Sequence, residues 1–239
     1  MSHRRACDLS TEDRAQIIRQ SEIGTRLDDD LITRMAAASN AVDYRRRRFI
    51  YRKRDAADTL YIIARGRVKL CTIEEATKRE AVIDILGNGA LFGESALYTT
   101  GAREKCAVAY ENVRLLRVPV GDFQEAMFTQ RGLNDYILRL IGQRLLRAEQ
   151  RVANFALDAI PARLDKLLIE FSERYGRDEA GGVLIDLALP HREIASIVGS
   201  TRESVTVRLN AMRRAGIIEF VNRKILIKTP AAIAATSPV

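Results

Sequence analysis

The segment LPHREIASIVGSTRESVTVRLNAM, residues 189–212, has the pattern of two short amphipathic helices separated by one glycine. Pro190 suits the opening of the first helix, and Gly199 suits its end because glycine adopts turn conformations without strain. In both helices apolar residues recur at the spacing of a buried helical face. They are Ile194, Ile197 and Val198, then Val205, Leu209 and Met212. This pattern predicts a helix-turn-helix.

The start of the second helix combines a cap with exposed polar side chains. Ser200 and Glu203 have the spacing of a capping box, in which both side chains satisfy free backbone amides at the helix start. The exposed front of a recognition helix enters the major groove, so we expect base contacts from Arg202, Glu203 and Thr206. Arginine can donate two hydrogen bonds to guanine, and glutamate can accept one from cytosine. A capped pair of surface helices without a ligand is the alternative.

Two apolar-rich runs, residues 217–221 and 225–228, flank a short basic turn after Gly216. They predict a β-hairpin, or wing, behind the second helix. Contacts to phosphates position such a domain on a duplex without specifying sequence. The candidates for these backbone contacts are Ser200, Thr201, Arg208, Arg213, Arg214, Arg223 and Lys224. A hairpin that is only solvated is the alternative.

The whole chain has 239 residues, a net charge of +8 and a pI near 9.7. This length suits two domains with separate cores. The positive charge predicts attraction to a polyanion, either nucleic acid or an anionic membrane surface. No run approaches the roughly 18 consecutive apolar residues of a membrane span. Residues 1–14 lack the apolar stretch of a signal peptide, so we expect a cytoplasmic protein without a membrane partner.

From about Asp43 to Pro119 the apolar residues alternate in short runs punctuated by glycines, which is typical of an antiparallel β-sandwich or barrel. The chain is therefore predicted to have an α+β fold: an N-terminal antiparallel β-roll, a long helix and a C-terminal winged helix-turn-helix. The expected boundaries are a helical extension over 1–30, the β-roll over 31–132, the long helix over 133–157, the winged helix over 158–230 and a tail over 231–239.

The predicted long helix carries an apolar stripe at alternating spacings of three and four residues, as in a coiled coil. The stripe consists of Leu138, Ile141, Leu145, Ala148, Val152 and Phe155. Such a stripe usually packs on its own domain. This helix has a second apolar side, formed by Tyr136, Ile137 and Leu140, that can pack on its own domain. The stripe can then pack against the same helix of a second subunit. A two-fold dimer sets two recognition helices about 34 Å apart and requires a palindromic site in double-stranded DNA.

The order of these parts resembles the cyclic-AMP receptor and fumarate-nitrate regulator (Crp/Fnr) family of bacterial transcription factors. The most specific stretches are DTLYIIARGRVKL at 58–70, LFGESALYTTG at 91–101 and IASIVGSTRESV at 194–205. The resemblance implies a cyclic-nucleotide-binding-like jelly roll, a homodimer and contact with RNA polymerase. It also implies that Arg202 and Glu203 recognise a TGTGA-like half-site. Val207 stands where typical members have a further arginine, so the outer part of the half-site is expected to differ.

The same resemblance implies an effector pocket at Gly93, Glu94 and Ser95, the start of the family's phosphate-binding cassette. In the family's cyclic-nucleotide binders an Arg-Ser pair holds the phosphate. Glu104 and Lys105 occupy these two positions in this chain. A carboxylate repels a phosphodiester, and lysine lacks the planar fork that matches phosphate.

The long helix also departs from the pattern, because Ala148 and Glu149 replace a Thr-Ser pair that meets adenine. We therefore do not expect cyclic AMP to be the effector, and the identity of the effector stays open. Arg103 and Lys105 are the candidates that remain to supply the missing charge.

Other cofactors have weak support in the sequence. The family's iron–sulfur cluster uses four thiolates, mostly near the N-terminus, where this chain has only Cys7, so we do not expect one. The β-half contains no histidine for haem, although a thiolate ligand stays open. The other two cysteines, Cys71 and Cys106, are candidates for a redox pair or for inert buried thiols. No cysteine spacing predicts a metal site.

These observations predict a homodimeric, sequence-specific DNA-binding transcription regulator controlled by a signal at its β-roll. The alternative is a ligand- or protein-binding regulatory module that does not act through specific DNA. An enzyme has little support, because the sequence shows no metal cluster, no nucleophile array that contains histidine and no phosphate-binding loop with a lysine, and no catalytic residue can be named. The basic run over 45–54 has no assigned role, and an anionic partner there is a hypothesis.

Overall fold

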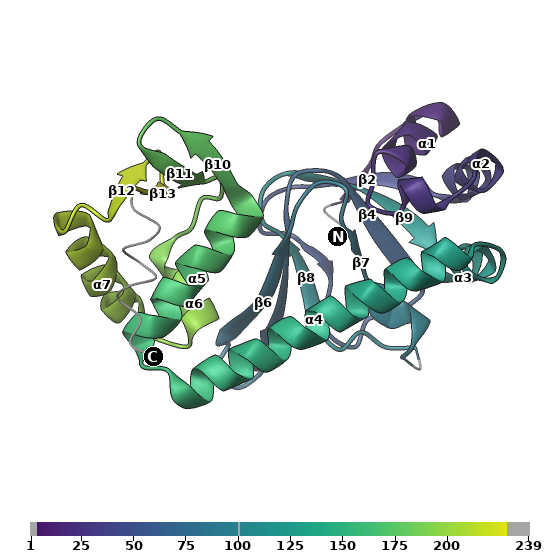
Figure 1. Ribbon diagram of the computed structural model, residues 1–239. Helices are drawn as coiled ribbons and strands as arrows, with labels where there is room; N and C mark the ends of the chain where they lie inside the picture. The colour runs from purple at the N-terminus through teal and green to yellow at the C-terminus, as the bar shows by residue number, and fades with distance from the viewer. Residues whose placement is uncertain (1–3, 100, 229–239) are drawn as a thin grey trace. The chain divides into compact units, whose positions relative to one another are not determined.

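The computed structural model describes residues 4–99 and 101–228 (Figure 1). The chain forms two compact units, residues 1–144 and 145–239. Within the described ranges, no helix has the length and apolar character needed to cross a bilayer. The predicted tail over 231–239 lies outside the described residues.

The first unit contains two antiparallel sheets, and this confirms the predicted N-terminal β-rich domain. One sheet has the order β1-β2-β9-β4-β7, with bounds Arg4–Ala6, Asn40–Tyr44, Val113–Pro119, Thr59–Arg65 and Leu91–Phe92. The other has the order β3-β8-β5-β6, with bounds Phe49–Tyr51, Cys106–Ala109, Val68–Ile73 and Glu80–Leu86. The strands expected from alternation are present. Short strands β1, β2 and β7 were not predicted.

Strand β4, which lies between β9 and β7, is buried on both faces, and its alternating side chains divide the unit into two cores. Successive side chains of a strand point to opposite sides. Tyr61 and Ile63 therefore join a core that also receives side chains from the second sheet, whereas Leu60 and Ile62 join a core formed with helices. The β-roll is thus a layered structure of sheet, sheet and helices.

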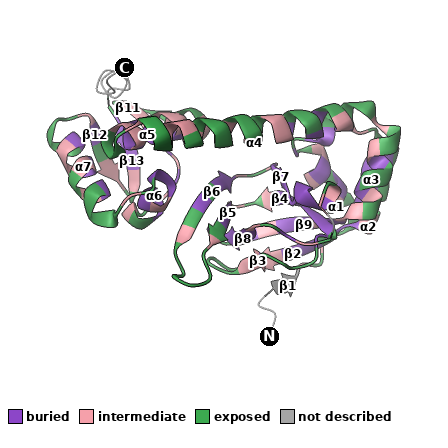
Figure 2. Cartoon of the chain, turned by 90° about the horizontal axis from the view of Figure 1, so that it is seen from below, coloured by how far each residue is buried: buried purple, intermediate pink, exposed green. Residues whose placement is uncertain are grey.

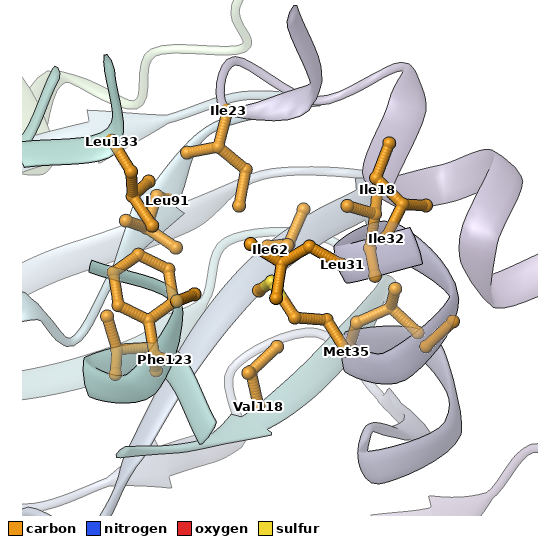
Figure 3. Close-up of a cluster of buried hydrophobic side chains, with 14 of the residues drawn as sticks. Ile18, Ile23, Leu31, Ile32, Met35, Ile62, Leu91, Val118, Phe123 and Leu133 are labelled. Atoms are coloured by element: carbon orange, nitrogen blue, oxygen red, sulfur yellow. The ribbon is translucent and has the colours of Figure 1, made fainter. Parts of the chain in front are cut away.

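Helices α1, α2 and α3 cover the outer face of the first sheet, with bounds Thr11–Arg19, Asp29–Ala38 and Val120–Thr129. Figure 3 shows Ile18, Leu31 and Met35 of α1 and α2 turned toward Ile62 of β4 and Val118 of β9. The N-terminal segment gave no strong core pattern in the sequence. The structure nevertheless packs it into this core and adds its strand β1 to the sheet beside β2.

Helix α4, Arg131–Leu157, is the predicted long helix. Its first turns bury Leu133, Tyr136, Ile137 and Leu140 in the helical core, which confirms that one apolar side packs inward. Much of the rest of its surface is exposed (Figure 2).

The second unit contains α5, Ile160–Tyr175, followed by α6, His191–Val198, and α7, Arg202–Arg214. An antiparallel sheet of order β10-β11-β13-β12 completes it, with bounds Gly176–Glu179, Gly182–Ile185, Lys224–Ile227 and Ile218–Val221. Strands β12 and β13 are the predicted wing. The hairpin of β10 and β11 was not predicted, and it extends the wing to four strands.

Candidate nucleic-acid interface

The helix-turn-helix consists of α6 and α7 joined at Gly199, as predicted. Gly199 ends α6 in the left-handed conformation, with φ 65° and ψ 49°. Glycine tolerates this conformation without the steric cost that a Cβ atom imposes. All the residues predicted to be buried are buried: Ile194, Ile197 and Val198 in α6, and Val205, Leu209 and Met212 in α7. Glu193 and Ala195 of α6 are buried as well.

The cap of α7 lies one residue later than the predicted capping box. Thr201, in extended conformation, is the N-cap, and its Oγ1 accepts a hydrogen bond of 3.1 Å from the Ser204 amide. The backbone N–H of Ser200 instead donates to Ala195 in α6. Within the described chain, the buried Ser200 Oγ has no hydrogen-bond partner. The predicted pairing of Ser200 with Glu203 is therefore wrong, because the turn uses Ser200 to close α6.

The first turn of α7 presents Arg202 and Glu203 to solvent. Thr206, the third predicted base-contact residue, is half-buried and already bonded. Its Oγ1 donates to the Arg202 carbonyl at 2.8 Å and lies 2.8 Å from Nδ1 of His191. Of the three predicted base-contact residues, Arg202 and Glu203 are thus the exposed ones.

His191, which no sequence pattern assigned to the site, joins the start of α6 to α7 and to the wing. Its ring lies 5.9 Å from that of Phe220 in β12. Burial lowers the pKa of His191, and the nearby Arg202 guanidinium lowers it further. The neutral imidazole is therefore favoured beside the recognition helix. A histidine one residue after a proline gave no distinguishing pattern in the sequence.

Arg208 was predicted to contact the DNA backbone, but the structure places it against α5. Its Nη2 and Nε atoms donate to the two carboxylate oxygens of Asp165, at 2.5 and 3.4 Å. Asp165 is fully buried. This paired contact holds α7 on α5, so in this conformation the guanidinium serves the core of the unit.

The wing turns through Asn222 and Arg223, which both have positive φ, at 49° and 66°. Two such residues form the tight turn whose twist matches antiparallel strands. Arg223 is exposed at the tip, whereas Lys224 lies in β13 and forms an ion pair with Asp186. Arg213 is exposed at the end of α7, with its guanidinium 5.8 Å from the Phe220 ring centre.

In the β-roll, the predicted effector residues Gly93, Glu94 and Ser95 form a buried corner after β7. Glu94 forms ion pairs with Arg144 of α4 and with Lys105, the latter at 3.6 Å. Burial alone would raise the pKa of Glu94, but Arg144 and then Lys105 outweigh it and hold the pKa below its ordinary value. The carboxylate is therefore ionised and already neutralised within the unit.

Arg103 does not replace the missing phosphate ligand. Its side chain is fully buried, donates to the carbonyl oxygens of Gly93 and Thr59, and stacks over the Tyr51 ring at 4.5 Å. Glu104 is exposed at the place of the family's arginine. The residues present therefore do not fit the phosphate of a cyclic nucleotide, because both nearby cations are committed to protein acceptors.

The two inner cysteines lie directly opposite each other, Cys71 in β5 and Cys106 in β8. Both are buried as free thiols. Burial raises the pKa of Cys71, and the Glu80 carboxylate raises it further. Because a thiolate is the reactive form, Cys71 is a poor nucleophile. Among the described residues, no cluster of three or more histidine, cysteine or acidic side chains has the arrangement of a metal site.

The apolar stripe on α4 is largely exposed. Leu138, Leu145 and Val152 are 69%, 56% and 68% exposed, and Phe155 is 46% exposed. Ala148 is exposed as well, whereas Ile141 packs partly against the helical core. A helix that exposes large side chains every seventh residue has the surface of a coiled-coil partner.

The basic run over 45–54 lies in the loops on both sides of β3. Its arginines and lysine are exposed. Arg52 stacks over the Phe49 ring at 3.5 Å, and Arg54 forms an ion pair with Glu75 at 3.5 Å.

Both parts of the chain match known families. The cyclic nucleotide-binding domain family matches residues 41–130, and the Crp-like helix-turn-helix domain family matches residues 162–236. A global nitrogen regulator of a Nostoc species is 30% identical over 192 residues, which cover 80% of this chain and 86% of the relative. A CRP-like cAMP-activated global transcriptional regulator of Mycobacterium tuberculosis is 26% identical over 212 residues, covering 89% and 94%.

A solved structure has the same fold. The chain is similar to FixK2 from Bradyrhizobium japonicum with a TM-score of 0.74 and 19% identity, over 84% of this chain and 98% of that one.

Proposed function

The chain belongs to the Crp/Fnr family of DNA-binding transcription regulators, and on that premise we propose that it binds a palindromic, TGTGA-like operator as a homodimer under the control of a signal received by its β-roll. The observation that carries this proposal is the exposed Arg202–Glu203 pair on the first turn of α7. Arginine matches guanine and glutamate matches cytosine in the major groove.

Backbone contacts complete this interface. Thr201 is exposed at the helix start, and Arg213 and Arg223 are exposed at the helix end and the wing tip. Lys224 and Arg208 would have to leave their carboxylate partners to reach a phosphate. Ser200 would have to turn its buried hydroxyl outward. We therefore assign the main phosphate contacts to Thr201, Arg213 and Arg223.

The exposed stripe on α4 supports the homodimer. A twin helix packed on Leu138, Leu145 and Val152 would bury apolar area that a single chain leaves in water. Two-fold symmetry then repeats the recognition helix on the second half of the operator. We include contact with RNA polymerase in the proposal only because the family resemblance implies it.

The signal is proposed to act on the β-roll and to shift the population of dimer geometries through the segment from Asn154 to Pro161. The M. tuberculosis relative is named as cAMP-activated. In this chain Glu104 stands where the phosphate needs a cation, so we propose an effector other than cyclic AMP, or activity without one.

Random-site selection with the purified full-length protein tests the proposal. We expect a two-fold symmetric site with guanine and cytosine at the positions that face Arg202 and Glu203. Arg202→Ala should weaken binding by about 1 to 3 kcal/mol and relax the base preference at one position. Arg177→Ala, an equal charge change on an exposed strand, should leave the selected site unchanged.

Two outcomes contradict the proposal. Equal binding to all oligonucleotides would favour a regulatory module that does not use specific DNA. A change below a few tenths of a kcal/mol for Arg202→Ala would show that α7 does not recognise the bases.

A further inference from the structure

One large apolar side chain on the recognition helix α7 is exposed to solvent. Val207 is 67% exposed, whereas Val205, Leu209 and Met212 of the same helix are buried. Residue 207 is two positions from both 205 and 209, so its side chain points roughly 200° away from theirs around the helix. Val207 therefore lies on the side of α7 opposite the face that packs in the core.

The side of α7 that carries Val207 also carries Glu203. The two residues are four positions apart, so they lie on one face of the helix, one turn from each other. Glu203 is exposed and belongs to the pair to which we assign base contacts. The chain neighbours of Val207, Thr206 and Arg208, are both bonded to other elements of the unit. On this face, Val207 is thus the first side chain after Glu203 that can approach a base.

Neither packing nor helix stability explains a valine at this position. A side chain that stays in water contributes little hydrophobic stabilisation to the folded unit. Branching at Cβ also makes valine a weaker helix former than alanine or a long polar residue. The exposed methyl groups would be used by an apolar contact with a ligand. The proposed ligand of this face is the major groove of DNA.

We propose that Val207 is a specificity-determining residue that contacts the C5-methyl group of a thymine in the major groove. This inference rests on the proposed function and adds one base to the operator. The thymine methyl is the apolar group in the major-groove pattern of the base pairs. Guanine presents two acceptors instead, and a valine against them would displace their water without supplying a donor. Val207 therefore favours thymine and disfavours guanine at its position.

The geometry of the helix limits where this thymine lies. A helix advances roughly 6 Å over four residues, and base pairs stack roughly 3.4 Å apart. The thymine is therefore expected within two steps of the base pair that Glu203 contacts. A valine in a helix also has one strongly preferred χ1 rotamer. Its methyl groups are already ordered, so the contact costs little conformational entropy.

Removal of single methyl groups from the DNA tests the proposal. The probe is the operator that the wild-type, full-length protein selects from random sites. In one half-site, each thymine is replaced in turn by uracil, which lacks only the C5-methyl group. We expect one of these replacements, within two steps of the pair assigned to Glu203, to weaken wild-type binding about fourfold. Fluorescence anisotropy measures the dissociation constants.

Val207→Ala should abolish this methyl effect, because it removes both γ-methyl groups, so the thymine and uracil probes should bind this variant equally. Leu146→Ala is the matched control, since Leu146 is an apolar residue of α4 with a similar exposure of 65%. It should keep the fourfold effect. In the wild-type protein, a C·G pair in place of the T·A pair should weaken binding, and 5-methylcytosine at that place should recover part of the loss.

The outcomes separate this inference from the proposed function. Failure to select a symmetric site with guanine and cytosine opposite Arg202 and Glu203 would overturn both. A selected site without a thymine within two steps of the Glu203 pair would overturn the role of Val207 alone. Equal effects of every uracil replacement on the wild type and on Val207→Ala would do the same. Urea denaturation should give the variant the wild-type free energy of unfolding, because Val207 is exposed.

Discussion

At the scale of single residues, Arg208 shows how one contact changes a predicted role. Its guanidinium neutralises the fully buried Asp165 carboxylate from 43 positions away in the sequence. A buried charge that loses its partner is strongly destabilising. Without the Asp165 contact, Arg208 would be available to a DNA phosphate, as its position in the sequence predicted.

We expect Arg208→Ala to lower the free energy of unfolding by about 3 kcal/mol, because it removes the guanidinium that is paired with the buried Asp165 carboxylate. Urea denaturation measures this. Arg214→Ala, at an exposed position of the same helix, should change the value by less than about 0.5 kcal/mol. Similar losses for both variants would mean that the ion pair does not anchor α7.

His191 gives the folded protein a pH dependence with a definite sign. Its pKa is lowered in the folded state, so the unfolded chain binds its proton more readily. The free energy of unfolding should therefore fall as the pH drops below the ordinary histidine value of about 6.5, until the lowered pKa is passed. The stabilising contribution is fully present above that window.

Because the chain has only two histidines, His3→Gln is a natural control for His191→Gln. Urea denaturation at several pH values between about 5 and 7.5 gives the free energy of unfolding at each pH. This free energy should change less steeply with pH in His191→Gln, and His3→Gln should leave the pH dependence unchanged. An unchanged slope in that variant would assign the pH dependence to other groups.

At the scale of elements, the start of α7 depends on which hydroxyl caps it. Thr201 Oγ1 accepts from the Ser204 amide, whereas the Ser200 hydroxyl lacks a partner in the described structure. We expect Thr201→Ala to cost about 1 kcal/mol of stability, the usual loss for an N-cap. Ser200→Ala should cost nothing, since it removes a buried and unsatisfied polar group.

Thermal and urea unfolding of both variants compare the two caps directly. A larger loss of stability for Ser200→Ala than for Thr201→Ala would support the capping box of Ser200 and Glu203 that the sequence pattern predicted. Thr201 also belongs to the proposed DNA interface, so stability is the appropriate measurement here.

At the scale of the whole molecule, the proposed homodimer depends on one face of α4. Leu145→Glu should convert the protein to a monomer at micromolar concentration, because it places a charge in the proposed apolar seam. Leu146→Glu is the matched control, since Leu146 is 65% exposed but points about 100° away around the helix. Sedimentation velocity distinguishes the two.

Dimer loss in both variants, or in neither, would place the subunit interface elsewhere. A monomeric Leu145→Glu protein should also lose preference for a palindrome over a single half-site, because each half is then bound independently.

The sequence alone determined the elements whose hydrophobic period is strong. The pattern around Gly199 predicted both helices of the helix-turn-helix, and alternation predicted the main strands of the β-roll, because burial of one face imposes the period of that structure. Strand β10, GRDE, is exposed at all four residues and has no such period. It is a strand only because β11 supplies its hydrogen bonds.

The tertiary structure decided the roles of individual polar side chains. Whether Arg208, Lys224 and Thr206 face a ligand or a protein partner depends on Asp165, Asp186 and His191. These partners lie outside the elements that carry Arg208, Lys224 and Thr206. The local sequence around each residue therefore does not show which partner will lie next to it in the folded protein. Hydrophobic periodicity is a local property that a sequence displays directly, whereas an ion pair or hydrogen bond exists only once the chain has brought two distant groups together.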